Sequence, residues 1–96
     1  MRFEWDAEKA ARNERLHGVS FEEAAELFTT DAPVLEIYDL KHSDCEDRYK
    51  SLGPIKHGLV LVVWTERTDD LIRIISAWWA TKAEQELYNE YAEQMR

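Results

Sequence analysis

The sequence has almost none of the cysteine from which disulfides and zinc clusters are built. Cys45 is the only cysteine among 96 residues, which excludes an intrachain disulfide and a cysteine-based metal cluster. A pair of histidines at the spacing His-x-x-x-His, another common basis of a metal site, is missing as well. We therefore expect no metal and no cofactor. A single free cysteine is typical of the reducing cytoplasm, which is the location we expect.

Long apolar runs and glycine-rich loops are also absent. The longest apolar run, Leu59–Trp64, is far shorter than the ~20 residues of a membrane helix. Charged residues interrupt Met1–Asp6, where a secretory signal requires a continuous apolar stretch. Three glycines in the whole chain form no phosphate-binding loop. These absences predict a protein that is neither secreted nor attached to a membrane.

Positive charge is in deficit. Twelve Lys and Arg stand against twenty Asp and Glu, which gives a net charge of −8. Such a protein repels phosphate polymers overall, so any binding of nucleic acid must depend on a local basic patch. Apolar residues are present in ordinary amount, at 45% of the composition, as in a folded globular protein. A chain of this length predicts one domain over residues 1–96.

Residue patterns predict the element order β-α-α-β-β-β-β-α. Alternating or β-branched segments predict strands at residues 2–5, 34–38, 48–53, 59–65 and 71–77. The segment 59–65 is nearly all apolar and β-branched, which is typical of a central strand buried on both faces. Strands joined by short turns favour an antiparallel sheet, so we expect an α+β fold. We expect the helices on one face of the sheet, and a free opposite face available for binding.

Capping residues mark where the three predicted helices begin. Asp6 precedes the first helix, over residues 7–16, and Gly18 follows it as a C-terminal glycine. Ser20 with Glu23 forms a capping box for a second helix that reaches residue 28. A second capping box opens the terminal helix after Thr81.

Seven groups of residues, in this order, resemble one protein family: Phe3-Glu4-Trp5-Asp6; Lys9 with Asn13; His17-Gly18-Val19-Ser20-Phe21-Glu22-Glu23-Ala24; Arg48 with Gly53; Val62-Val63 with Thr65-Glu66-Arg67; Ile72-Arg73-Ile74-Ile75-Ser76-Ala77; and Ala80-Thr81 with Glu84. Over nearly the whole chain they resemble the BrnT-type toxins of bacterial type II toxin–antitoxin systems. The resemblance implies a RelE-like fold and a metal-independent endoribonuclease that stops translation. It also implies a ribbon-helix-helix antitoxin, through which alone the toxin would contact DNA.

The chain departs from the family pattern after Ala77. Where the family carries an arginine, commonly followed by another basic residue or proline, this sequence has Trp78 and Trp79. An arginine fork suits a clamp on the scissile phosphate, whereas Trp78 can stack on a base but cannot neutralise an oxyanion. We therefore expect a ribonuclease whose activity is attenuated.

Metal-free cleavage of RNA needs an acid, a base and cations on the phosphate. The candidate catalytic residues are His17, Arg48, Arg67 and Arg73, and the candidate RNA-binding residues are Lys9 and Lys50. His17 also fits a helix C-terminal cap, and Lys9 fits a surface ion pair. The arginines form one basic patch if the strands align, or are solvated arginines paired with carboxylates.

The adjacent residues Trp78 and Trp79 cannot both point inward from one strand, so at least one is exposed or covered by a partner. Both are candidate partner-binding residues. Beside the ribonuclease hypothesis stands a non-catalytic interaction module, which binds an antitoxin and takes part in DNA-linked autoregulation. A small unrelated α+β enzyme is a third reading, supported by the fold class alone.

Overall fold

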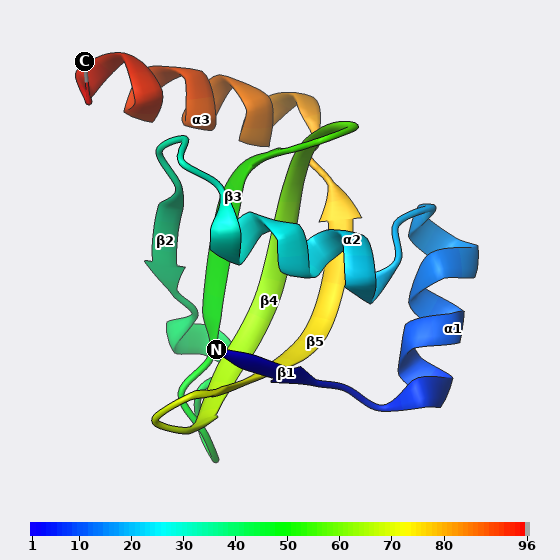
Figure 1. Cartoon of the computed structure of the whole chain (residues 1–96). Coiled ribbons are helices and arrows are strands. Elements are labelled where there is room, and N and C mark those ends of the chain that lie inside the picture. The colour runs from blue at the N-terminus through cyan, green and yellow to red at the C-terminus, as the bar shows by residue number, and fades with distance from the viewer. Residues whose placement is uncertain (96) are drawn as a thin grey trace.

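The structure, a computed structural model, describes residues 1–95 (Figure 1). Its elements are β1 (Arg2–Glu4), α1 (Ala7–His17), α2 (Phe21–Ala25), the 3₁₀ helix η1 (Glu26–Thr29), β2 (Leu35–Tyr38), the 3₁₀ helix η2 (Leu40–His42), β3 (Tyr49–Ile55), β4 (Gly58–Thr68), β5 (Leu71–Trp79) and α3 (Lys82–Gln94). The predicted α+β class and element order are confirmed. The second predicted helix is divided, because its last turn winds into η1.

The five strands form one sheet in the order β1-β5-β4-β3-β2. Neighbouring strands from β2 to β5 are antiparallel, but β1 runs parallel to β5, with Arg2 beside Leu71 and Glu4 beside Arg73. The prediction of a wholly antiparallel sheet was wrong for this edge. The alternation within a three-residue strand shows which residues share a face but not which strand it joins or in which direction.

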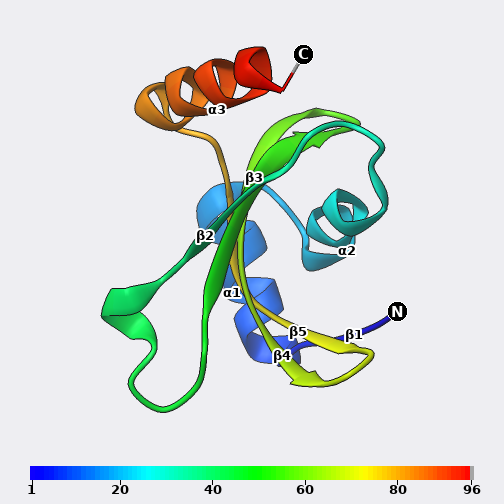
Figure 2. The same cartoon turned by 90° about the vertical axis from the view of Figure 1, so that its left-hand side faces the viewer.

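The helices lie on both faces of the sheet, contrary to the prediction of one covered face. α2 crosses the face that carries Val60, Val62 and Ile74, whereas α3 packs through Tyr88 on the opposite face (Figures 1 and 2). β4 lies between these two apolar clusters, and its residues 60–65 are buried, as predicted for a central strand. The terminal helix was expected on the same face of the sheet as the other two helices. The apolar stripe of this helix shows which of its sides is buried, but not which face of the sheet it covers.

The face under α3 is apolar at one end and charged at the other. Leu52 of β3 and Ile75 of β5 belong to the cluster around α3. Lys50 and Arg73 lie two residues before them, so strand alternation places these two cations on the same face, farther from α3. α3 therefore covers the apolar half and leaves the charged half uncovered. We call this charged half the open face and define it by Arg48, Lys50, Arg67 and Arg73.

α1 is attached to the exposed edge of β5 by a buried side chain, Asn13. β1 occupies this edge only as far as Arg73. Farther along, Asn13 Nδ2 donates to the Ala77 carbonyl at 2.8 Å, and its Oδ1 accepts from the Ala77 amide at 3.2 Å and from Ser76 Oγ at 3.1 Å. The side-chain amide thus acts as a one-residue strand partner that satisfies the backbone of β5.

Replacing Asn13 with alanine is expected to lower the free energy of unfolding by about 2–3 kcal/mol. The change leaves the buried amide and carbonyl of Ala77 unpaired, at about 1–3 kcal/mol for each. The better helix propensity of alanine recovers only about 0.5 kcal/mol. Urea unfolding followed by circular dichroism measures the difference as a lower midpoint at unchanged m-value. Asn89→Ala, at an exposed position of α3, is the matched control. Equal midpoints for the two variants would contradict the role assigned to Asn13.

Candidate functional site

Three arginines of the open face are linked through two glutamates into one continuous chain of ion pairs. Arg73 Nη1 donates to Glu4 Oε2 at 2.9 Å, and Arg67 Nε lies 3.7 Å from the same oxygen. Arg67 Nη1 then lies 3.8 Å from Glu46 Oε1, and Arg48 Nε lies 3.7 Å from Glu46 Oε2. We call these five residues the arginine chain. Three cations against two anions leave it with one net positive charge.

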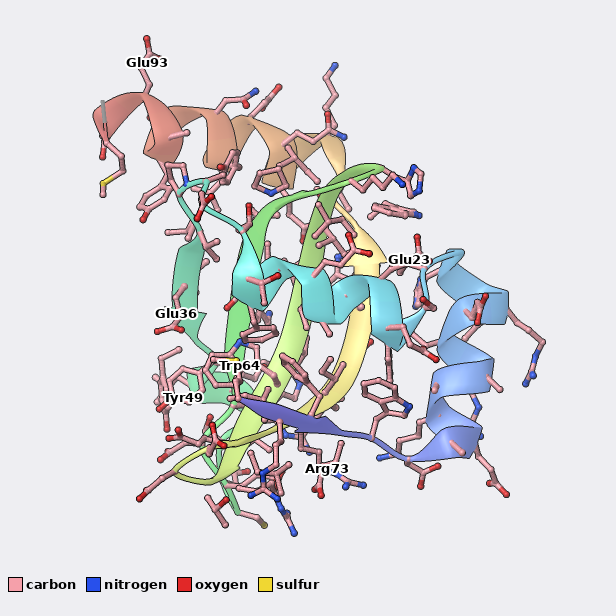
Figure 3. All side chains as sticks on the ribbon, viewed as in Figure 1. Glu23, Glu36, Tyr49, Trp64, Arg73 and Glu93 are labelled. Atoms are coloured by element: carbon pink, nitrogen blue, oxygen red, sulfur yellow. The ribbon has the colours of Figure 1, made fainter. Side chains whose placement is uncertain are left out.

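The arginine chain combines the two alternatives that the sequence left open. The arginines are paired with carboxylates, and the pairing also holds them together on one surface. The side chains are between 32% and 50% exposed, so each ion pair adds little to the stability of the fold. The main effect of the arginine chain is to hold the three guanidinium groups close together. Figure 3 shows Arg73 where β1 crosses the end of the sheet, opposite α3.

One donor in the arginine chain has no hydrogen-bond partner. Arg48 Nε is buried and makes no hydrogen bond within residues 1–95. Its nearest carboxylate, from Glu46, lies beyond hydrogen-bonding distance at 3.7 Å. A buried unpaired donor is costly, so an anion that reached this atom would gain a hydrogen bond that the protein does not itself provide.

A groove between α1 and β5 continues from the arginine chain. Residues of α1 and β5 line it: Lys9, Arg12, Asn13, Leu16, His17, Ile75 and Ser76. Lys9 and His17 are eight residues apart, so they stand about 12 Å from each other along the helix axis. Arg12 was missed as a candidate, although its helical spacing from Lys9 indicates that the two share a face.

The Lys9 end of the groove adjoins Arg73. Asp6, the N-cap of α1, has a pKa below its ordinary value. The hydrogen bond from the Lys9 backbone amide is the largest cause, and the charges of Lys9 and Arg73 lower this pKa further. Asp6 caps α1 through the Lys9 amide and lies two residues after Glu4, which is in register with Arg73, so the backbone places the first turn of α1 at the arginine end of the site. The place of Lys9 in the first turn of α1 is explained by this neighbourhood.

His17 lies at the other end of the groove, beside Trp78. The two ring centroids are 6.2 Å apart, and the Trp78 indole donates to Glu84 at 3.1 Å. Trp79 points to the face of the sheet opposite Trp78. There it packs on the apolar cluster that contains Val60, Val62 and Ile74, and its indole donates to the Gly18 carbonyl at 3.3 Å. The structure therefore brings the three predicted arginines together with Lys9, and separates His17 from them by the length of the groove.

His42, the last residue of η2, has a fixed partner. Its Nδ1 lies 3.0 Å from Asp39 Oδ2, and its side chain is 55% exposed whereas Asp39 is buried. Burial opposes ionisation of Asp39, but the hydrogen bond and charge of His42 and the charge of Lys50 outweigh it and lower its pKa. This pair lies at the start of the connection from β2 to β3. Figure 1 shows β2 on the side of the sheet opposite α1.

Within residues 1–95, no helix is long and apolar enough to cross a membrane. In the same part of the chain, no three His, Cys, Asp or Glu side chains are arranged to hold a metal ion.

A family model described as the ribonuclease toxin BrnT of type II toxin–antitoxin systems matches residues 5–84. The chain belongs to this family. The resemblance noted in the sequence is thus confirmed, and with it a toxin that has an antitoxin partner. The BrnT fold is supported independently by a crystal structure of the Brucella abortus ribonuclease toxin BrnT, which superposes with a TM-score of 0.64 at 21% identity. The alignment covers 85% of this chain and 99% of that one. A search among curated proteins finds no match.

Proposed function

We propose that this BrnT-type toxin is a metal-independent endoribonuclease that cleaves RNA on the open face and so stops translation in the cytoplasm. The observation that carries the proposal is the arginine chain. A protein with a net charge of −8 has gathered three arginines, from β4, from β5 and from the position just before β3, on one surface, with Lys9 near them. Cations placed at one phosphate are what metal-free RNA cleavage requires, because negative charge develops on the phosphate oxygens in the transition state.

Each part of the open face has a role in this proposal. Arg67 and Arg73 bind the scissile phosphate, since a guanidinium presents several donors in a planar fork that matches phosphate oxygens. Lys9 and Lys50 bind neighbouring phosphates. An RNA strand that follows the groove along α1 reaches His17 and Trp78 at its far end. His17 contacts the RNA there, and His17→Ala in the same cleavage assay tests its predicted acid–base role.

We further propose that the antitoxin, of the ribbon-helix-helix type, binds the end of the groove formed by Leu16, His17, Trp78, Trp79 and Thr81. These residues line one depression. Leu16 is 69% exposed and lines the same depression as Trp78 and Trp79, so the exposed apolar surface here is a contiguous patch, as at a protein-binding site. Because the acidic surface provides no general attraction to an acidic partner, apolar contacts would supply much of the affinity. An antitoxin bound there would also block the groove, and any contact with DNA would be made through it.

Arg73→Ala is expected to lower kcat/KM for RNA cleavage by about 10²–10³, the usual cost of one donor to a developing oxyanion. The assay follows cleavage of a fluorescent single-stranded RNA at several salt concentrations, because binding through a few cations weakens as counterions compete. The matched control is Arg15→Ala, an exposed arginine of α1 that does not line the groove. Similar losses in the two variants would exclude the open face. No cleavage by any form, with antitoxin binding intact, would favour the interaction module.

Trp78→Arg is expected to raise RNA cleavage, because it restores a cation beside His17. Glu84, which now accepts from Trp78, would pair with the new arginine and mask part of its charge. The Trp78→Arg/Glu84→Gln variant should therefore lower KM by about tenfold, and Trp78→Arg alone by less, because the new cation binds an RNA phosphate at the far end of the groove and not the scissile phosphate at Arg67 and Arg73. Glutamine can still complete the capping box of α3, so the helix is retained. Strong cleavage by the unmodified chain, unchanged by either variant, would show that Trp78 does not attenuate activity.

Trp79→Ala is expected to speed dissociation of the antitoxin more than it slows association, since apolar contacts mainly determine the lifetime of a complex. Surface plasmon resonance with the antitoxin of the same system measures both rates. Because Trp79 also packs on the core, Leu16→Ser provides a second test at an exposed position. An affinity insensitive to both changes, and abolished by salt alone, would contradict an apolar contact at this end of the groove.

A further inference from the structure

Within the proposed ribonuclease function, on which this inference rests, we propose that Glu4 is the general base of the cleavage. Glu4 takes the proton from the 2′-hydroxyl of the RNA while Arg67 and Arg73 hold the adjacent phosphate. The residue therefore has a chemical role in the site besides its structural role in the arginine chain. The argument depends on where its two carboxylate oxygens stand.

Glu4 lies between the two arginines with one oxygen occupied and the other available. Oε2 accepts from Arg73 at 2.9 Å and faces Arg67 at 3.7 Å. Oε1 accepts no hydrogen bond from residues 1–95, and the side chain is 34% exposed. Each guanidinium has five N–H donors and uses few of them here. A phosphate bound by the remaining donors of both arginines must lie against Glu4, which places its ribose within reach of Oε1.

Backbone structure holds Glu4 more firmly than it holds the other glutamate of the chain. Glu4 is on β1 in register with Arg73. Its sequence neighbours Phe3 and Trp5 pack on the main core, so their contacts anchor the strand. Glu46 comes from the connection between β2 and β3, and its contacts with Arg48 and Arg67 are 3.7 and 3.8 Å long. A catalytic group is effective when its position is fixed before substrate binds, which favours Glu4.

The two histidines that could otherwise serve as the base have other surroundings. His17 stands beside Trp78 at the far end of the groove, about 12 Å from Lys9 along α1. His42 is bound through Nδ1 to Asp39, in the connection that follows β2. Glu4, in contrast, contacts two of the arginines assigned to the scissile phosphate.

The proposed step is balanced without any further reactant except water. The 2′-hydroxyl proton moves to Glu4 Oε1 as the 2′-oxygen attacks phosphorus. The bond between phosphorus and the 5′-oxygen breaks, and the leaving 5′-oxygen takes a proton from water. The hydroxide that this leaves takes the proton from Glu4, which restores the carboxylate. The products are a 2′,3′-cyclic phosphate and a 5′-hydroxyl end. Arg67 and Arg73 balance the negative charge that develops on the non-bridging oxygens.

Glu4→Gln separates this role from a structural one because it keeps the shape and removes the base. We expect kcat to fall by about 10²–10⁴. Binding of a 2′-O-methyl RNA, which has no proton to lose, should stay the same or tighten, because a negative charge has been removed. Glu66→Gln, at an exposed position of β4, is the neutral control. Glu46→Gln, which also removes a carboxylate from the arginine chain, should act mainly through RNA affinity.

A second substrate tests the assignment as base. Uridine 3′-(4-nitrophenyl phosphate) has a leaving group that needs no proton, so loss of a general acid is tolerated and loss of a general base is not. Glu4→Gln should lose as much rate on this substrate as on RNA. Glu4→Asp, which keeps the charge but shortens the side chain, should retain more activity than Glu4→Gln on both substrates. It also provides the test if the glutamine variant does not fold.

Three results would overturn the assignment, and they differ from a failure of the proposed function. A kcat for Glu4→Gln within about threefold of the parent would exclude a base. So would a loss confined to 2′-O-methyl RNA binding, or equal activity of Glu4→Asp and Glu4→Gln. If neither the parent chain nor Trp78→Arg forms a 2′,3′-cyclic phosphate from RNA, the proposal of a ribonuclease is wrong. The proposed role of Glu4 as general base is then wrong as well.

Discussion

The hydrogen bonds of Asn13 determine where the candidate site stands. They join α1 to the edge of β5 that β1 leaves open, and they satisfy both backbone groups of Ala77. Lys9, Arg12 and His17 are carried by the same helix, whose position against β5 is fixed by Asn13 together with the packing of Ala10 on the core. Asparagine is a poor residue for a helix interior. The unfavourable helix propensity of Asn13 is offset by its tertiary hydrogen bonds, which require a side-chain amide.

Local signals explain how much of the fold could be predicted. The starts of all three helices follow from side chains that bond to backbone within three residues, as Asp6, Ser20 and Thr81 do. Residues 59–65 could be assigned to the central strand because burial on both faces requires an apolar run. The element order and the BrnT family were accessible for the same reason, since both depend on short patterns along the chain.

The rest depends on contacts between distant residues. Glu4 and Arg73 are 69 positions apart, and no local pattern around Phe3-Glu4-Trp5 indicates that the glutamate holds two arginines. The direction of β1 and the face chosen by α3 are non-local in the same way. The three arginines could be selected as cations, but their separation from His17 could not, because it depends on how α1 lies along β5.

The position of Glu84 links two parts of the molecule that have separate tasks. Its carboxylate accepts from the Thr81 amide, which begins α3, and from the Trp78 indole at the end of β5. The first turn of α3 and the side chain at the end of the groove therefore share one anchor. Fraying of that turn would free Trp78 to change rotamer. The first turn of α3 and the end of the groove at Trp78 should therefore fluctuate as one cooperative unit.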